Sequence, residues 1–127
     1  VTHEAQMAQA IARDTGNHLW DATTEAKALA GKIDITLNFS SQLIEDVRIP
    51  NALPSVDGVI RHKPRGVMAV IGPFNFPAHL PNGHIIPALM LGNTVIFKPS
   101  EQTAAVGQLY AELVDKAQFP AGVFNMV

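Results

Sequence analysis

The sequence of 127 residues contains no cysteine. This absence excludes disulfide bridges, thiolate metal sites and a thiol nucleophile within these residues. Charged residues make up only 16% and the net charge is −2, which argues against a nucleic-acid or membrane-surface partner. No apolar run reaches the roughly 18 residues of a membrane span, and the histidines lack metal-ligand spacing. We expect a soluble, cytoplasmic globular segment that binds no metal.

Both ends of the sequence are typical of a segment cut from a longer chain. The sequence begins without Met, and it stops in the apolar run 123–127, whereas natural termini are usually polar and poorly ordered. We therefore expect a fragment.

The first half favours helices followed by an extended arm. A helix is predicted from Val1 to about Asp14, with a stop at Gly16-Asn17. A second, amphipathic helix is predicted from Trp20 to Leu43-Ile44, with Asp21 or Thr23 as its N-cap. Prolines then interrupt two short extended runs, which is typical of edge strands. We divide the chain into a helical part (1–46), a β arm (47–65) and a sheet part (66–127).

The second half alternates apolar runs with helical patterns. Residues 67–71 and 94–97 are continuously apolar, as in parallel strands that are buried on both faces. A helical connection is predicted over 78–90, with Pro87 opening a second short helix. A further helix should begin at Thr103 as N-cap and end at 119–122, before a third strand at 123–127. The pattern β-α-β-α-β predicts an α/β fold, part of a Rossmann-like doubly wound parallel sheet.

Two polar segments follow the predicted strands, namely Gly72–Pro77 and Lys98–Glu101. Ligands of parallel sheets bind beyond the carboxyl ends of the strands, so both segments are candidates for a site. The pattern alone leaves structural roles equally open: Asn75 could hydrogen-bond within a turn, Lys98 could lie on the surface, and Ser100 and Glu101 could serve a helix start. Neither a Gly-x-Gly-x-x-Gly turn nor a phosphate-binding P-loop is present.

The segments Gly72–Pro77 and Gly92–Thr103 together resemble motifs of the NAD(P)-dependent aldehyde dehydrogenase superfamily. Asp14–Trp20 and Phe119–Asn125 are similar to two further family segments, so the resemblance extends over nearly the whole chain. It implies an enzyme that oxidises a small-molecule semialdehyde to the carboxylate through a cysteine thiohemiacetal. It also implies a homodimer or homotetramer.

The resemblance implies a role for each matching residue. Asn75 matches the asparagine that donates a hydrogen bond to the oxyanion. Lys98 and Glu101 match residues that hold the ribose hydroxyls of the cofactor, and other cofactor contacts match Ile71, Gly72, Pro73, Phe74 and Ser100. A carboxylate beside the ribose favours NAD over NADP, although rotation of Glu101 would relieve its repulsion of a 2′-phosphate.

The sequence departs from the family pattern at three points. Phe74 replaces a frequent Trp, and Ala104 replaces a frequent Pro. The family's nucleophilic cysteine, general-base glutamate and Gly-rich cofactor loop would fall beyond Val127, so we expect this segment alone to be inactive. A non-catalytic nucleotide-binding module, or another semialdehyde dehydrogenase or phosphate- or coenzyme-A-linked reductase with a related fold, remains open.

Overall fold

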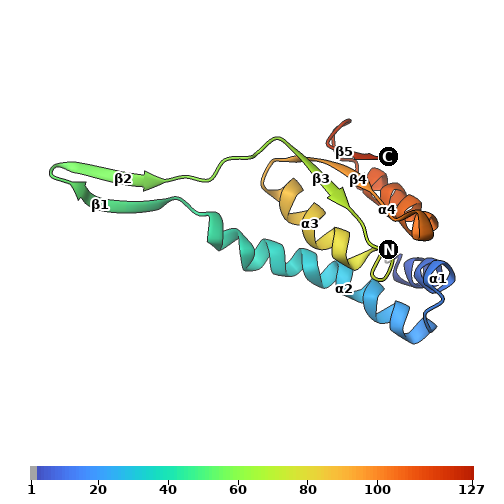
Figure 1. Cartoon of the computed structure of the whole chain (residues 1–127). Coiled ribbons are helices and arrows are strands. Elements are labelled where there is room, and N and C mark those ends of the chain that lie inside the picture. The colour runs from blue at the N-terminus through green and yellow to red at the C-terminus, as the bar shows by residue number, and fades with distance from the viewer. Residues whose placement is uncertain (1–2) are drawn as a thin grey trace.

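The computed structural model describes residues 3–127 and places a layer of helices against a parallel sheet, with a long hairpin projecting to one side (Figure 1). The elements in chain order are α1 (Glu4–Thr15), α2 (Leu19–Asn38), the 3₁₀ turn η1 (Ser40–Ile44), β1 (Val47–Leu53), β2 (Val56–Ile60), β3 (Val67–Ile71), α3 (His79–Met90), β4 (Thr94–Lys98), the 3₁₀ turn η2 (Glu101–Thr103), α4 (Ala104–Lys116) and β5 (Phe124–Met126).

The three strands β3, β4 and β5 pair in parallel, in that order. Each pair is connected by a helix, α3 and then α4. The predicted β-α-β-α-β unit of a doubly wound sheet is therefore confirmed. The strand side chains Val70, Val95 and Phe97 belong to one buried cluster with residues of both helices.

The prediction that these strands are buried on both faces is wrong for this chain. Val67, Ile71 and Ile96, which alternate with the buried positions, are 66%, 77% and 39% exposed. The reason is that α3 and α4 both pack on the face of Val70 and Phe97. No other element of residues 3–127 covers the opposite face.

Helices α1 and α2 extend the core beyond the crossover helices. α1 packs on α2 and α4, and α2 packs on α3. Small side chains at these contacts, including Ala8, Ala22 and Ala26, are almost fully buried and allow the helix backbones to approach closely. One continuous cluster of buried side chains thus joins the N-terminal helices to the sheet.

The ends of the N-terminal helices differ in part from the prediction. α1 begins at Glu4, and the predicted residues 1–2 lie outside the described residues; its stop at Gly16 is confirmed by a left-handed φ of 77°. α2 begins at Leu19 with His18 at the N-cap position, so neither Asp21 nor Thr23 caps it, contrary to the prediction. The Thr23 hydroxyl donates to the Leu19 carbonyl instead.

α2 also ends earlier than predicted, at Asn38, and continues only as the 3₁₀ turn η1. The Ser41 hydroxyl donates to the Leu37 carbonyl at 2.8 Å. Such a bond competes with a backbone N–H for the Leu37 carbonyl, close to the residue where the α-helix ends.

Pro87 does not open a second helix, contrary to the prediction; it lies inside the continuous helix α3. A proline here removes one helical hydrogen bond. The buried face of α3 continues across it, with Ile85 before and Ala88 after, so packing outweighs the missing bond.

α4 begins after Thr103, as predicted, but it ends earlier than predicted. Thr103 occupies the N-cap position, but its buried hydroxyl makes no hydrogen bond within the described residues. The acceptor comes from α1, where the Asp14 carboxylate binds the Val106 N–H at 3.1 Å. The helix ends at Lys116, ahead of 119–122, and the chain turns at Gln118, whose φ is 58°.

The hairpin β1–β2, which we call the arm, projects from the body (Figure 1). Its strands are antiparallel, and its turn places Pro54 before Ser55, whose φ is 64°; a proline followed by a positive φ is typical of a type II turn. Nearly every side chain of the arm is exposed. At its base the Nε and Nη2 groups of Arg61 donate hydrogen bonds to the Asp46 carboxylate, which lowers the pKa of that carboxyl.

Candidate active site

The two polar segments that follow β3 and β4 leave the sheet at the same edge. Ile71 and Lys98 are direct partners in the parallel register. The Gly72 N–H donates to the Lys98 carbonyl at 2.9 Å. The structure therefore brings the starts of Gly72–Pro77 and Pro99–Glu101 together, side by side.

Gly72 anchors the first segment on the core. A Cβ atom at this position would lie 3.0 Å from the Phe97 ring and 3.1 Å from the Pro81 ring, and Phe97 itself is fully buried. Only glycine fits there without displacing one of these rings. Beyond it Pro73 is half-buried, while Phe74 and Asn75 are exposed.

The second segment presents a cation beside an anion. The Lys98 ammonium donates to the Glu101 carboxylate at 2.6 Å and to the Pro99 carbonyl at 2.9 Å. The hydrogen bond from Lys98 lowers the pKa of the Glu101 carboxyl. Both side chains remain accessible, at 43% and 82% exposure. Ser100 accepts the Gln102 N–H, so its hydroxyl oxygen caps the turn η2.

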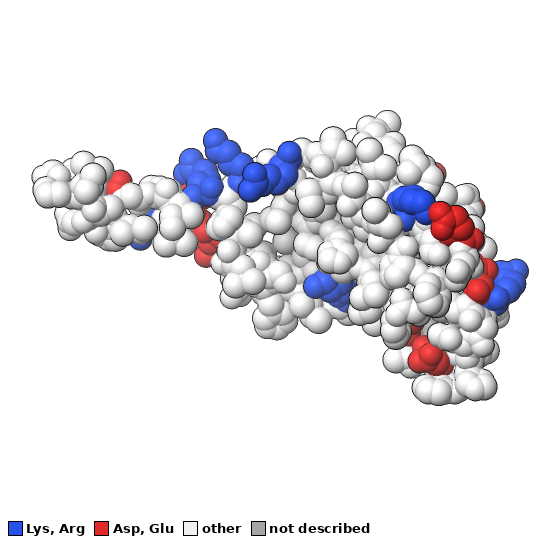
Figure 2. Space-filling view, viewed as in Figure 1, with Lys and Arg blue, Asp and Glu red and all other residues white. Residues whose placement is uncertain are grey.

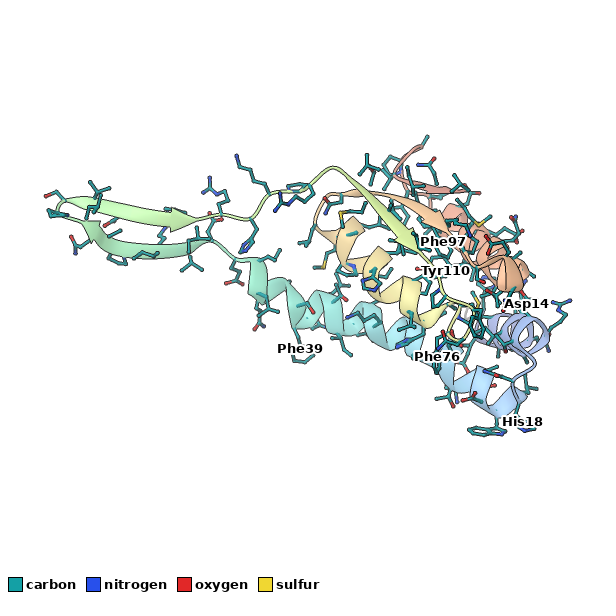
Figure 3. The ribbon with its side chains drawn as sticks, viewed as in Figure 1. Asp14, His18, Phe39, Phe76, Phe97 and Tyr110 are labelled. Atoms are coloured by element: carbon teal, nitrogen blue, oxygen red, sulfur yellow. The ribbon has the colours of Figure 1, made fainter. Side chains whose placement is uncertain are left out.

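The starts of both crossover helices are occupied by carboxylates from the N-terminal helices. Glu25 of α2 accepts the Ala78 and His79 N–H groups at the start of α3, and Asp14 of α1 accepts the Val106 N–H of α4. Figure 3 shows Asp14 beside the start of α4. Such N–H groups often hold a ligand phosphate. Here they are satisfied by the protein itself.

The sequence analysis missed Glu25, although a signal for it exists. The residue lies between Ala22, Ala26 and Leu29 on the apolar stripe of α2, where a charged side chain must find a buried partner. Glu25 is only 5% exposed, and its partner is the start of α3.

Two buried asparagines, also missed, fix the surroundings of the segments. The Asn93 carbonyl oxygen accepts the Arg65 and Gly66 N–H groups just before β3. Asn82 donates to the Leu29 carbonyl of α2 and accepts the Tyr110 hydroxyl at 2.8 Å. Burial raises the pKa of Tyr110. Its ring packs edge-on against that of Phe97.

A cavity of about 860 Å³ lies along the free edge of β3, between α3 and the segment leading from the arm. Of the predicted site residues only Ile71 lines it; Asn75 and Lys98 do not. Lys63 and Arg65 also line it, and Figure 2 shows basic side chains gathered where the arm joins the body. Among the described helices, none is long and apolar enough to cross a membrane.

The sequence matches the model of the aldehyde dehydrogenase family over residues 1–127. It is 53% identical over 125 residues to an N-succinylglutamate 5-semialdehyde dehydrogenase of Vibrio cholerae, covering 96% of this chain and 25% of that protein. The chain spans about a quarter of the length of the curated relatives it matches.

Solved structures of similar fold cover 98% of this chain. An NADP-dependent enzyme from E. coli superposes with a TM-score of 0.90 at 33% identity, over 26% of its own chain. A methylmalonate-semialdehyde dehydrogenase from Sinorhizobium meliloti, described as a putative enzyme in complex with NAD, gives 0.86 at 30% identity over 25% of its chain.

Proposed function

Because the chain belongs to the aldehyde dehydrogenase family, we propose that it is part of an NAD-dependent enzyme that oxidises N-succinylglutamate 5-semialdehyde to the carboxylate, a step of arginine breakdown. The observation that carries this proposal is the 48–53% identity to dehydrogenases named for that substrate, across the whole chain. The nucleophilic cysteine and general base come from outside these residues, so the activity belongs to the complete enzyme that carries this chain.

In this proposal Asn75 is a catalytic residue. Addition of a thiolate to the aldehyde places a negative charge on oxygen, and an amide N–H stabilises that charge without titrating near neutral pH. The exposed position of Asn75, just beyond the carboxyl end of β3, supports this role. Removal of one such donor typically costs about 3 kcal/mol, or a factor of 10² to 10³ in rate.

The segment after β4 fits a ribose. Lys98 offers N–H donors and Glu101 offers acceptor oxygens, 2.6 Å apart and both accessible, which matches two neighbouring hydroxyl groups. We propose that these two residues hold a ribose of NAD, with Ile71, Gly72, Pro73, Phe74 and Ser100 lining the adjoining groove. When bound, NAD would accept the hydride that leaves the former aldehyde carbon after the thiolate has added. The Glu25 and Asp14 carboxylates already accept N–H groups at the starts of α3 and α4, which disfavours binding of the diphosphate there.

Steady-state kinetics of the complete enzyme test the proposal. We expect kcat/KM for N-succinylglutamate semialdehyde to exceed that for succinate semialdehyde, and NAD to be preferred over NADP. Asn75→Ala should lower kcat by 10² to 10³, whereas Asn38→Ala, an exposed amide at the end of α2, should leave it unchanged. Equal kcat/KM for both aldehydes contradicts the substrate assignment, and an unchanged kcat in Asn75→Ala contradicts its role.

We further propose that the complete enzyme is at least a dimer and that the arm takes part in its assembly. The arm has two free strand edges and exposed apolar side chains, among them Val47, Leu53 and Val59, and such edges pair readily with another chain. Light scattering at micromolar concentration should give at least twice the subunit mass. A monomer mass would refute the assembly.

A further inference from the structure

Among residues 3–127, the partners of the buried Glu25 carboxylate all lie at a helix start. Its Oε1 atom accepts the Ala78 N–H at 3.0 Å and the His79 N–H at 2.9 Å. The two ion pairs formed by residues 3–127 do not include it. A buried carboxylate without a cation is tolerated when N–H groups and the positive end of a helix dipole solvate it. Glu25 and the start of α3 thus stabilise each other.

Asn75 depends on its backbone for its position. Its side chain is exposed, and no hydrogen bond of the described residues involves its amide. Within residues 3–127, no contact of the amide itself therefore fixes where its N–H points. The backbone of 72–79 must do so.

That backbone is held at both of its ends. At one end the Gly72 N–H donates to the Lys98 carbonyl at 2.9 Å, and the Gly72 backbone packs against the Phe97 ring. At the other end Glu25 binds residues 78 and 79. Only two residues separate Asn75 from Ala78, and one of them is Pro77, whose ring fixes φ. A shift at the start of α3 is consequently passed on to Asn75.

We propose that Glu25 is a positioning residue, which fixes the start of α3 and thereby aims the Asn75 amide at the oxyanion. This inference rests on the proposed function. Glu25 does not hold α2 to α3 alone, because Asn82 also donates to the Leu29 carbonyl one turn further along. Loss of the Glu25 carboxylate therefore frees the loop while the two helices stay packed.

A double-mutant cycle in the complete enzyme tests the inference. Glu25→Ala should lower kcat by roughly tenfold to a hundredfold, the loss expected for a displacement of about 1 Å, with KM for NAD within about twofold of the wild type. In the Asn75→Ala background, Glu25→Ala should lower kcat no further, because the amide it aims is gone. Glu25→Gln keeps an acceptor oxygen and should recover most of the activity.

Asp14→Ala is the matched control, because Asp14 also accepts an N–H at the start of a crossover helix, that of Val106 in α4, but it does not adjoin Asn75. If Asp14→Ala lowers kcat, it should do so by the same factor in the wild type and in the Asn75→Ala background, so that the two losses multiply. If Glu25→Ala does not fold, the same double-mutant cycle can be measured with Glu25→Asp. This variant keeps the carboxylate, but its side chain is one methylene too short to reach the start of α3.

The outcomes separate the two proposals. If Asn75→Ala leaves kcat unchanged, the proposed site itself fails. If Asn75→Ala lowers kcat but the loss from Glu25→Ala or Glu25→Asp multiplies with it, the positioning role is overturned while the site stands. A Glu25→Gln variant as slow as Glu25→Ala likewise overturns it.

Discussion

A single methyl group at Gly107 should disturb the segment that follows β4. Gly107 lies in α4, and a Cβ atom there would be 2.5 Å from Pro99 Cβ and 2.6 Å from Pro99 Cγ. Ordinary carbon contacts are about 3.5–4.0 Å, so helix and proline must separate by about 1 Å. The proline ring cannot rotate away. Pro99 stands between Lys98 and Ser100, so the displacement reaches the proposed ribose site.

The size of the effect follows from two opposing contributions. Overpacking of this kind typically costs about 1–3 kcal/mol, while replacing glycine by alanine inside a helix gains about 1 kcal/mol. Gly31→Ala makes the same chemical change in α2, where the added Cβ would meet no side chain and no other element within 4 Å. The difference in unfolding free energy between the two variants therefore isolates the steric cost, about 1–3 kcal/mol.

Equilibrium urea unfolding of the complete enzyme measures this difference, and steady-state kinetics measures its functional consequence. We expect Gly107→Ala to be less stable than Gly31→Ala and to raise KM for NAD, with KM for the aldehyde unchanged. Equal stability of the two variants, together with an equal KM for NAD, would show that the close approach of α4 to Pro99 does not determine the position of the segment after β4.

Three further predictions concern single side chains. Burial raises the pKa of Tyr110, so above pH 10 the unfolded chain releases this proton while the folded chain keeps it. The free energy of unfolding should therefore fall by about 1.4 kcal/mol per pH unit. Tyr110→Phe should lose this slope in urea unfolding at pH 9 to 11, and an equal slope in both proteins would contradict the prediction. Asn93→Ala leaves the Arg65 and Gly66 N–H groups without their acceptor and should cost about 1–3 kcal/mol in the same assay, against a change near zero for Asn38→Ala. Glu101→Gln removes the charge that repels a 2′-phosphate and should lower KM for NADP relative to NAD; an unchanged ratio of the two KM values would remove Glu101 from cofactor selection.

The alternating strands and helices were predictable because their signals are local. Apolar runs such as 67–71 and 94–97 are too short for helices and lie between breakers, and the stop at Gly16 needs only a residue that accepts a positive φ. The shared edge of the two polar segments followed from the parallel order of the strands. These features depend on neighbours in sequence and on general rules of sheet topology.

The errors arose where distant segments decide the structure. Pro87 remains helical because Ile85 and Ala88 are buried on both sides of it. The start of α3 receives its acceptor from Glu25, which lies 53 positions earlier in the chain, and the start of α4 from Asp14, 92 positions earlier. No local sequence pattern specifies such a partner. The exposure of β3 likewise depends on which helices pack on which face. The roles assigned to Asn75, Lys98 and Glu101 stay predictions until the complete enzyme is assayed.

The projecting hairpin gives the chain two regions of very different resistance to opening. A two-stranded ribbon without a packed face is marginally stable in water, so its amide hydrogens should exchange almost as freely as those of a peptide unless another surface covers them. The helix and sheet amides around Phe97 should exchange only through much rarer openings. Slow exchange in residues 47–60 would then serve as a footprint, reporting directly that something has docked against the ribbon.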